Sequence, residues 1–283
     1  MNRSVLYIVN PIAGKKGRKQ RILSQLKATG ADIVYTEYAG HATELARSAG
    51  SYVVVAVGGD GTLNEVARGL VGTEKILGLM PCGSGDGLAR HLGIRGSFRH
   101  MSDVIGQGRI QTLDYARING RPFFSVSGVG LDAIVSERFA KAGKRGLWTY
   151  VEQAVKTWSG FVPEKYTITI DGRTLEREAV LITVANSNQW GNGAKITPLA
   201  RTDDGLLDIT IISMFRTIDI PVLALRLMTG SIHKSRFAEC LQGKEISITR
   251  SGEGPAHCDG DYMECGKVLD ISICPETLRV LVP

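Results

Sequence analysis

The chain has 283 residues, 34 of them glycine, and a formal net charge of +6. This length allows two domains, each with its own core. No sequence window approaches the ~18 apolar residues of a membrane span, and the apolar run at 5–9 is too short for a signal sequence, so we expect a cytoplasmic protein. Five cysteines occur without a C-x-x-C pair, which favours free thiols over disulfides or a zinc site. The positive charge suits anionic lipid headgroups, phosphorylated ligands or nucleic acid.

The N-terminal part of the chain alternates predicted strands with predicted helices. The strands are expected at 5–9, 32–38, 53–57 and 76–80, and the helices at 17–29, at 42–49 and from residue 63. This alternation predicts an α/β domain with a mainly parallel sheet. Ligands bind beyond the carboxyl ends of such strands, and polar loops follow three of them, at Asn10, Gly58 and Gly83.

The segment 52–70 carries the strongest local signal. Its strand is continuously apolar, as in a strand buried on both faces. Glycines follow at 58, 59 and 61, so backbone amides there can approach an anion closely. Thr62 is expected to cap a helix from Leu63. Asp60 would repel a phosphate unless a divalent cation lay between them, which indicates a nucleotide with Mg²⁺; the alternative is a glycine-rich turn with a solvated aspartate.

After Asp114 the pattern changes to short β-rich runs joined by turns. The runs lie at 117–129, 166–170, 179–185, 207–212, 245–248 and 268–273. They predict a second, mostly antiparallel domain, a sandwich or an open barrel. Helices at 146–161 and 219–234 combine apolar with aromatic or basic residues, which suits either core packing or a membrane interface. We expect an α/β domain at 1–115, to which a last strand in 277–283 could return, and a β-rich domain at 116–276.

Five short motifs occur in one order along the whole chain. They are Asn10-Pro11-x-x-Gly14, Gly58-Gly59-Asp60-Gly61-Thr62 with Asn64-Glu65, Pro81-x-Gly83-Ser84-Gly85, Asp204-Gly205-x-x-Asp208 and Asp259-Gly260-Asp261. In this combination the chain resembles the diacylglycerol kinase catalytic-domain family, which includes bacterial lipid kinases and the sphingosine kinases. The Gly-Gly-Asp-Gly-Thr motif alone is shared with NAD kinases and phosphofructokinase-like proteins. The resemblance implies an α/β nucleotide-binding domain followed by a β-rich domain of the antiparallel sandwich type, with ATP and lipid meeting in the cleft between them.

The resemblance also implies roles for individual residues. It places these residues around ATP, with Asp60 near the Mg²⁺: Asn10, Pro11, Gly14, Thr36, Gly58, Gly59, Asp60, Gly61, Thr62, Asn64, Glu65, Gly83 and Ser84. It assigns a second Mg²⁺ to the carboxylate of Asp204 and the carbonyls of Arg201 and Leu206, which are hard oxygen ligands. A plain β-turn is the alternative at Asp204-Gly205.

Transfer of a phosphoryl group to a hydroxyl needs a carboxylate that accepts the departing proton. Asp259 is the first candidate for this base. Asp261, where the family usually has Glu, orients the site or is the base itself. Taken alone, Asp259-Gly260 is also typical of an ordinary hairpin turn.

One departure from the family bears on the substrate. Gly85 is followed by Asp86-Gly87-Leu88, where most bacterial members have Asn-Asp-Phe, and in this respect the chain is more similar to the sphingosine kinases. We hypothesise that Asp86 or Asp114 contacts the lipid headgroup. A sphingoid long-chain base then competes with diacylglycerol as the substrate.

The sequence therefore predicts an ATP- and Mg²⁺-dependent lipid kinase of lipid metabolism that associates peripherally and reversibly with membranes. An NAD kinase is the nearest alternative enzyme, although the late Asp259 motif and the Gly83 loop fit lipid kinases better. A non-catalytic lipid- or nucleotide-binding regulator is the alternative of another class. No nucleic-acid partner is expected, and a homodimer stays open.

Overall fold

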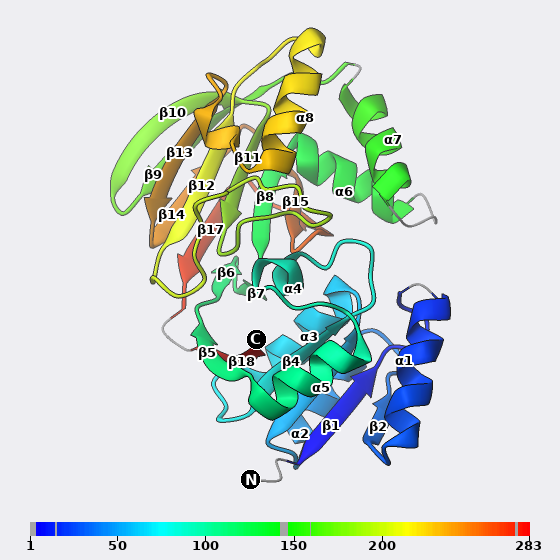
Figure 1. The fold of residues 1–283 in the computed structure, drawn as a ribbon. Coiled ribbons are helices and arrows are strands. Elements are labelled where there is room, and N and C mark those ends of the chain that lie inside the picture. Colours follow the sequence, from blue (N-terminus) through cyan, green and yellow to red (C-terminus); the bar gives the residue numbers. More distant parts are fainter. Residues whose placement is uncertain (1–3, 15, 142–146, 159, 275–276) are drawn as a thin grey trace. The chain divides into compact units, whose positions relative to one another are not determined.

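The computed structural model describes residues 4–14, 16–141, 147–158, 160–274 and 277–283 (Figure 1). The chain divides into two compact units. Unit 1 comprises residues 1–113 and 275–283, and unit 2 comprises residues 114–274. Within the described ranges, no helix is both long and apolar enough to span a membrane.

Unit 1 is built on one six-stranded sheet in the order β2-β1-β3-β4-β18-β5. Its strands are β1 Val5–Val9, β2 Asp32–Tyr35, β3 Val53–Gly58, β4 Ile76–Pro81, β5 Arg109–Leu113 and β18 Leu278–Val282. Neighbouring strands are parallel, except that β5 runs antiparallel to β18. β3 and β4 are buried along their whole length, as their apolar sequences predict. The predicted parallel α/β sheet is confirmed, and its second strand ends three residues earlier than expected.

The helices described in unit 1 connect these strands. They are α1 Lys16–Ala28, α2 His41–Ser48, α3 Asp60–Leu70, α4 Gly87–His91 and α5 Phe98–Gln107. α3 packs on β3 and β4, and α2 packs on α3. α3 begins at Asp60, directly after the extended residue Gly59. The predicted cap at Thr62 is wrong, because Thr62 lies inside the first turn and its buried side chain packs against Gly58.

Unit 2 contains two six-stranded antiparallel sheets (Figure 1). One has the order β10 Arg173–Ala179, β9 Glu164–Ile170, β14 Glu245–Thr249, β17 Val268–Ile273, β6 Ala116–Ile118 and β7 Arg121–Phe123. The other has the order β13 Ala238–Gly243, β12 Leu207–Ile212, β11 Leu181–Ala185, β8 Val126–Gly130, β15 Gly254–Cys258 and β16 Asp261–Cys265. One hydrophobic core combines Ile168 and Ile248 of the first sheet with Ile182 and Ile209 of the second. This arrangement confirms the predicted antiparallel sandwich.

Several predicted elements of unit 2 have different limits in the structure. The strand expected at 117–129 is divided into β6, β7 and β8. Asn119 and Gly120, with positive φ angles of 46° and 81°, form the turn between β6 and β7. The helix expected at 219–234 is α8 Ile220–Thr229, which ends at the left-handed Gly230.

Other elements of unit 2 were not predicted, or were predicted only in part. The helix expected at 146–161 is α7 Leu147–Trp158, and residue 146 lies outside the described ranges. The helix α6 Leu131–Lys141 and the strands β10, β13, β15 and β16 were not predicted.

Candidate active site

The glycine loops after β3 and β4 lie against each other in unit 1. A Cβ atom on Gly83 would lie 2.9 Å from the Cα atom of Gly59, so neither loop could approach the other as closely with a larger residue there. Asp60 connects the two loops. Its Oδ2 accepts a hydrogen bond from the amide of Asp86 at 2.8 Å, and its Oδ1 accepts one from the amide of Gly87 at 2.8 Å. The carboxylate predicted to sit near Mg²⁺ therefore also holds the second loop in place.

The side chain of Asp86 lies within the second loop. Its Oδ1 accepts a hydrogen bond from the amide of Gly83 at 3.0 Å, and the residue is only 4% exposed. Burial and the negative charge of Asp60 raise the pKa of Asp86 to about 6. Burial also raises the pKa of Asp60, while the amides of Gly87 and Asp86 act in the opposite direction. A cation at this place would favour the charged form of both carboxyl groups.

The loop after β1 adjoins the same place. Asn10 Oδ1 accepts hydrogen bonds from the amides of Ile12 and Ala13 at 3.0 and 3.1 Å. Gly14, with a φ of 81°, lies so close to the next loop that a Cβ atom would be 2.6 Å from the carbonyl oxygen of Cys82. The three polar loops therefore meet at the carboxyl ends of β1, β3 and β4, as expected.

Lys19, which was not predicted as a site residue, holds the Asn10 loop together. Its Nζ donates to the carbonyl oxygens of Asn10 at 3.4 Å, of Ala13 at 2.8 Å and of Pro11. The residue is 7% exposed, and burial lowers its pKa. In the sequence it stands in a basic run that is typical of a solvated helix face, so no local signal distinguishes it.

The other residues assigned to ATP have varied surroundings. Ser84 and Gly61 are exposed, whereas Thr36 and Asn64 are buried. Glu65 Oε2 accepts a hydrogen bond from the amide of Ala42 at 3.2 Å, at the start of α2. This contact explains Glu65 structurally, and contacts of these residues with ATP remain predictions.

In unit 2, Asp259 lies in the turn between β15 and β16. Its φ of 52° and the φ of 83° at Gly260 are typical of a tight two-residue hairpin. The carboxylate accepts three backbone hydrogen bonds, from the amides of Phe124 at 3.0 Å, Ser125 at 2.8 Å and Val126 at 3.1 Å. Asp259 thus joins this hairpin to the start of β8.

Asp261 follows this turn and has a more open environment. Its side chain is 57% exposed and lies 3.4 Å from Nη2 of Arg121. The two carboxylates of the Asp259-Gly260-Asp261 motif therefore differ in kind. Asp259 is engaged by backbone amides, and Asp261 reaches solvent.

Asn186, another residue that was not predicted, connects the segments of unit 2 that carry the candidate site residues Asp114, Asp204 and Asp259. Its Nδ2 donates to the carbonyl oxygens of Asp114 at 2.7 Å and Phe124 at 3.3 Å. Asp114 Oδ2 in turn accepts the amide of Gly205 at 2.7 Å. Asp114, the Asp204-Gly205 loop and the segment held by Asp259 therefore belong to one hydrogen-bonded network. The sequence signal that could have revealed Asn186 is a run of polar residues directly after the buried strand β11.

The Asp204 loop is a turn whose carboxylate is exposed. Asp204 Oδ1 accepts a hydrogen bond from the amide of Leu206 at 3.1 Å. Among the described residues, no group of three or more His, Cys, Asp or Glu side chains could hold a metal ion. A cation here would depend on the carbonyls of Arg201 and Leu206 and on water, and this site remains a prediction.

Comparison with known proteins finds two family models that match successive parts of the chain. A family model described as the diacylglycerol kinase catalytic domain matches residues 4–118. A second model, described as the YegS C-terminal NAD kinase beta sandwich-like domain, matches residues 125–282, which is more than half of the chain. The chain belongs to the diacylglycerol kinase family. It is therefore a kinase, and kinases of this family use ATP.

Individual relatives of this family cover nearly the whole chain. A diacylglycerol kinase of Mycobacterium tuberculosis is 28% identical over 302 aligned residues, with 99% of this chain and 95% of that protein covered. A solved diacylglycerol kinase structure from Bacillus anthracis has a TM-score of 0.76 at 22% identity and covers 100% of this chain and 98% of its own.

The NAD kinase of Archaeoglobus fulgidus, solved in complex with ATP, is more distant, with a TM-score of 0.58 and 11% identity over 98% of this chain and 93% of its own. At these identities the two solved structures show a shared fold and nothing further.

Proposed function

We propose that this diacylglycerol kinase family member transfers the γ-phosphoryl group of ATP to a hydroxyl group of diacylglycerol or a related lipid. The observation that carries the proposal is the carboxylate of Asp60, which joins two glycine loops at the carboxyl edge of the sheet. Backbone amides at this edge and at the start of α3 suit the phosphates of ATP. A carboxylate among them suits a nucleotide that arrives with a divalent cation.

The donor set at Asp60 fits Mg²⁺. Each oxygen of Asp60 accepts one amide hydrogen bond, and a carboxylate oxygen can accept a second contact. Mg²⁺ usually takes one or two carboxylates and completes its shell with water and phosphate oxygens. When bound, the ion would neutralise charge on the transferring phosphoryl group. Asp60 would hold it, and the Asn10 and Gly83 loops would orient the phosphates.

Unit 2 supplies the group that accepts the proton of the lipid hydroxyl. The hydroxyl oxygen forms a bond to the γ-phosphorus, the bond between that phosphorus and ADP breaks, and the hydroxyl proton moves to a carboxylate. The three amide hydrogen bonds at Asp259 tie its carboxylate to the start of β8, which supports a positioning role. The exposed carboxylate of Asp261 supports its role as the proton acceptor. This reverses the order of the two candidates that the sequence suggested.

The structure also bears on the choice of lipid. The hypothesis that Asp86 or Asp114 contacts the headgroup requires a carboxylate available to an ammonium group. Asp86 is buried with the amide of Gly83, and Asp114 holds the amide of Gly205. These engagements support diacylglycerol as the first substrate to test, ahead of a sphingoid base.

The test is transfer of ³²P from labelled ATP, with Mg²⁺, into mixed micelles of diacylglycerol, monoacylglycerol, phosphatidylglycerol, ceramide or a sphingoid base. We expect label in diacylglycerol. Asp261→Asn should lower kcat by about 10²–10⁴-fold, the usual contribution of a general base, without loss of fold. Asp259→Asn should lower both activity and stability. Glu264→Gln, an exposed substitution on the same strand as Asp261, serves as the control.

Three results would contradict the proposal. Label in NAD, when NAD replaces the lipid as acceptor, would identify an NAD kinase. Tight ATP binding without any labelled lipid or NAD would identify a regulator. Full activity of Asp261→Asn together with a folded but inactive Asp259→Asn would return the role of base to Asp259.

A further inference from the structure

The helix α8 exposes apolar side chains where a surface helix usually carries polar ones. Val222, Leu225 and Met228 are 55%, 63% and 57% exposed, whereas Leu223 is buried. Their spacing of three residues places them along one side of the helix. Ile218, just before α8, is 75% exposed. Single exposed apolar residues are common, but a row of this kind marks an interaction surface.

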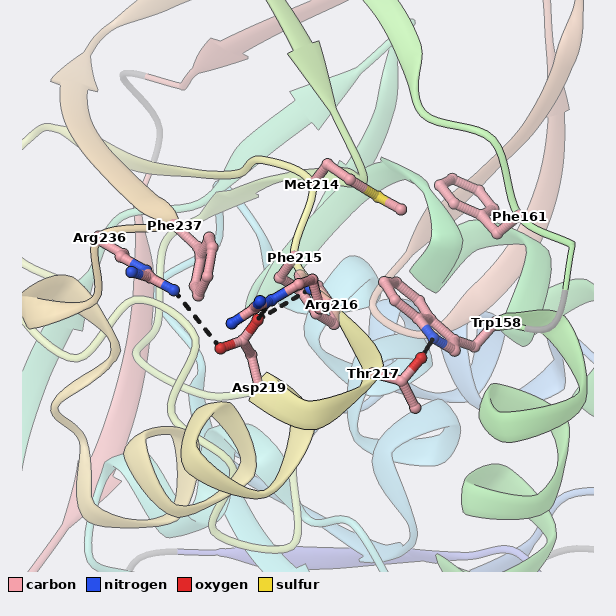
Figure 2. A pocket seen from close by; sticks show the side chains of 9 residues that line it. All are labelled: Trp158, Phe161, Met214, Phe215, Arg216, Thr217, Asp219, Arg236 and Phe237. Atoms are coloured by element: carbon pink, nitrogen blue, oxygen red, sulfur yellow. Dashed lines mark hydrogen bonds and ion pairs between the residues drawn. The ribbon is translucent and has the colours of Figure 1, made fainter.

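Unit 2 also has an aromatic pocket, whose lining residues Figure 2 shows. Trp158 of α7 stacks on Phe215 with ring centroids 4.3 Å apart, and Phe237 lies 6.1 Å from Phe215. The pocket has a volume of about 500 Å³. A second hollow of about 310 Å³ shares Phe237 with it and is lined by Val222 of α8. The aromatic cluster and the helix therefore form one continuous surface of unit 2.

Positive charge surrounds the same surface. The segment 214–237 contains four Lys or Arg residues and a single acidic residue, Asp219. The side chains of Arg216 and Arg236 are 79% and 72% exposed, and each lies near this carboxylate, at 3.5 and 3.6 Å. Figure 2 shows both arginines near Asp219, each from a different connecting segment. One carboxylate cannot neutralise two guanidinium groups, so a net positive charge remains exposed beside the apolar row.

We propose that this surface, the α8 face, docks onto a bilayer that contains anionic lipids. The α8 face consists of Ile218, Val222, Leu225 and Met228, with Arg216 and Arg236 at its edge. The apolar row would enter the region between the headgroups, and the arginines would contact lipid phosphates, which guanidinium groups bind well. A half-exposed Trp158 suits the same boundary between water and acyl chains.

Charge favours a bilayer over a second copy of this chain. A symmetric dimer through the α8 face would bring equal positive patches together, which is unfavourable, whereas an anionic bilayer complements them. Docking goes beyond the proposed phosphoryl transfer, because it requires neither ATP nor turnover. It can therefore be measured separately.

The test is flotation with vesicles of phosphatidylcholine, alone or mixed with phosphatidylglycerol, in the absence of ATP and diacylglycerol. We expect binding to the anionic vesicles that weakens with salt. Leu225→Ser should lower the partition coefficient about tenfold, as for loss of one buried leucine side chain. Arg216→Ala and Arg236→Ala should each lower it about fivefold. Val268→Ser on β17 and Lys165→Ala on β9, both exposed residues of the same unit, should leave it unchanged.

A spectroscopic measurement reports the place of contact. Vesicles with brominated acyl chains should quench part of the tryptophan fluorescence, and Trp158→Phe should remove that part. The proposal would be overturned if Leu225→Ser and the arginine variants had the same partition coefficient onto anionic vesicles as the wild type. So would a dimer in sedimentation that Leu225→Ser converts to monomer, because a second copy would then cover the face. If the protein binds anionic vesicles but phosphorylates no lipid in the ³²P assay, docking through the α8 face stands and the proposed phosphoryl transfer to lipid falls.

Discussion

Asp60 and Asp86 are two neighbouring carboxyl groups with different tasks. Asp60 accepts the amides of Asp86 and Gly87, and Asp86 accepts the amide of Gly83. The sequence assigned the first to a cation and the second to a lipid headgroup. Because Asp86 is buried, its ionisation should measurably lower the free energy of unfolding.

Asp86→Asn should remove a pH dependence of stability. The pKa of Asp86 is about 6 in the folded chain against an ordinary value of 3.8. Because the folded chain binds this proton more tightly than the unfolded chain, the free energy of unfolding should fall as the pH rises from about 4 to about 6, by about 3 kcal/mol. Asn tolerates the φ of 49° at this position and can accept the amide of Gly83.

The measurement is urea unfolding of both proteins across this pH range in Mg²⁺-free buffer. The variant should be at least as stable as the wild type above about pH 7, and the two should converge below about pH 4. Asp103→Asn, an exposed substitution on α5, is the control. A difference between Asp86→Asn and the wild type that is independent of pH would show that folding does not raise the pKa of Asp86. Lipid preference measured on the same variant tests the headgroup hypothesis.

Lys19→Met should disturb the Asn10 loop. Three backbone carbonyls would lose their buried cationic donor, so the free energy of unfolding should fall by about 1–3 kcal/mol. ATP binding, measured by calorimetric titration, should weaken because the loop is no longer held in place. Lys27→Met, at an exposed position on the same helix, provides the comparison. A less stable variant that binds ATP normally would show that the Asn10 loop does not contribute to ATP binding.

At the scale of elements, the contact between the two glycine loops can be tested by one methyl group. A Cβ atom on Gly85 would lie 2.7 Å from Oδ2 of Asp60, the oxygen that accepts the amide of Asp86. Gly85→Ala should therefore separate the loop from α3 and lower kcat/KM for ATP at least about tenfold, for which ~1.4 kcal/mol suffices.

Gly106→Ala on α5 is the matched control, because a Cβ atom there meets no heavy atom within 4 Å. Alanine in a helix is intrinsically more favourable than glycine, so this control should be slightly stabilising. Wild-type kinetics for Gly85→Ala, with a retained fold, would show that the contact between the loops does not matter for ATP.

At the scale of the whole molecule, the chain leaves unit 1 after β5, builds unit 2 and returns as β18. This last strand lies between β4 and β5 and pairs with both of them, so without it each of these two strands would lose a hydrogen-bonded neighbour. Its residues Leu278, Val280 and Leu281 are fully buried.

Leu281→Ala should lower the free energy of unfolding by about 2–5 kcal/mol, the usual cost of such a truncation in a core. ATP with Mg²⁺ should restore part of this loss, because a ligand that binds only the folded state stabilises it. Thermal unfolding with and without the nucleotide measures both effects, and Val268→Ala, at a half-exposed position, should change little. A loss in Leu281→Ala that ATP does not reduce at all would contradict binding of the nucleotide by unit 1.

Local sequence patterns predicted those elements whose residues are all buried to a similar degree along the segment. The uninterrupted apolar runs of β3 and β4 indicated central strands, because both of their faces are covered. The hairpin strands β15 and β16 and the half-exposed β13 were missed, since their mixed burial produces no clear alternation.

The sequence by itself determined the order of motifs, and with it the family, the α/β and sandwich units and the loops where ligands should bind. The tertiary structure decided what each polar side chain does there. The partners of these side chains are distant in sequence: 26 residues separate Asp60 from Asp86, 91 separate Asp114 from Gly205, and 134 separate Ser125 from Asp259. A hydrogen bond depends on where the two groups meet in space, and no local pattern specifies that.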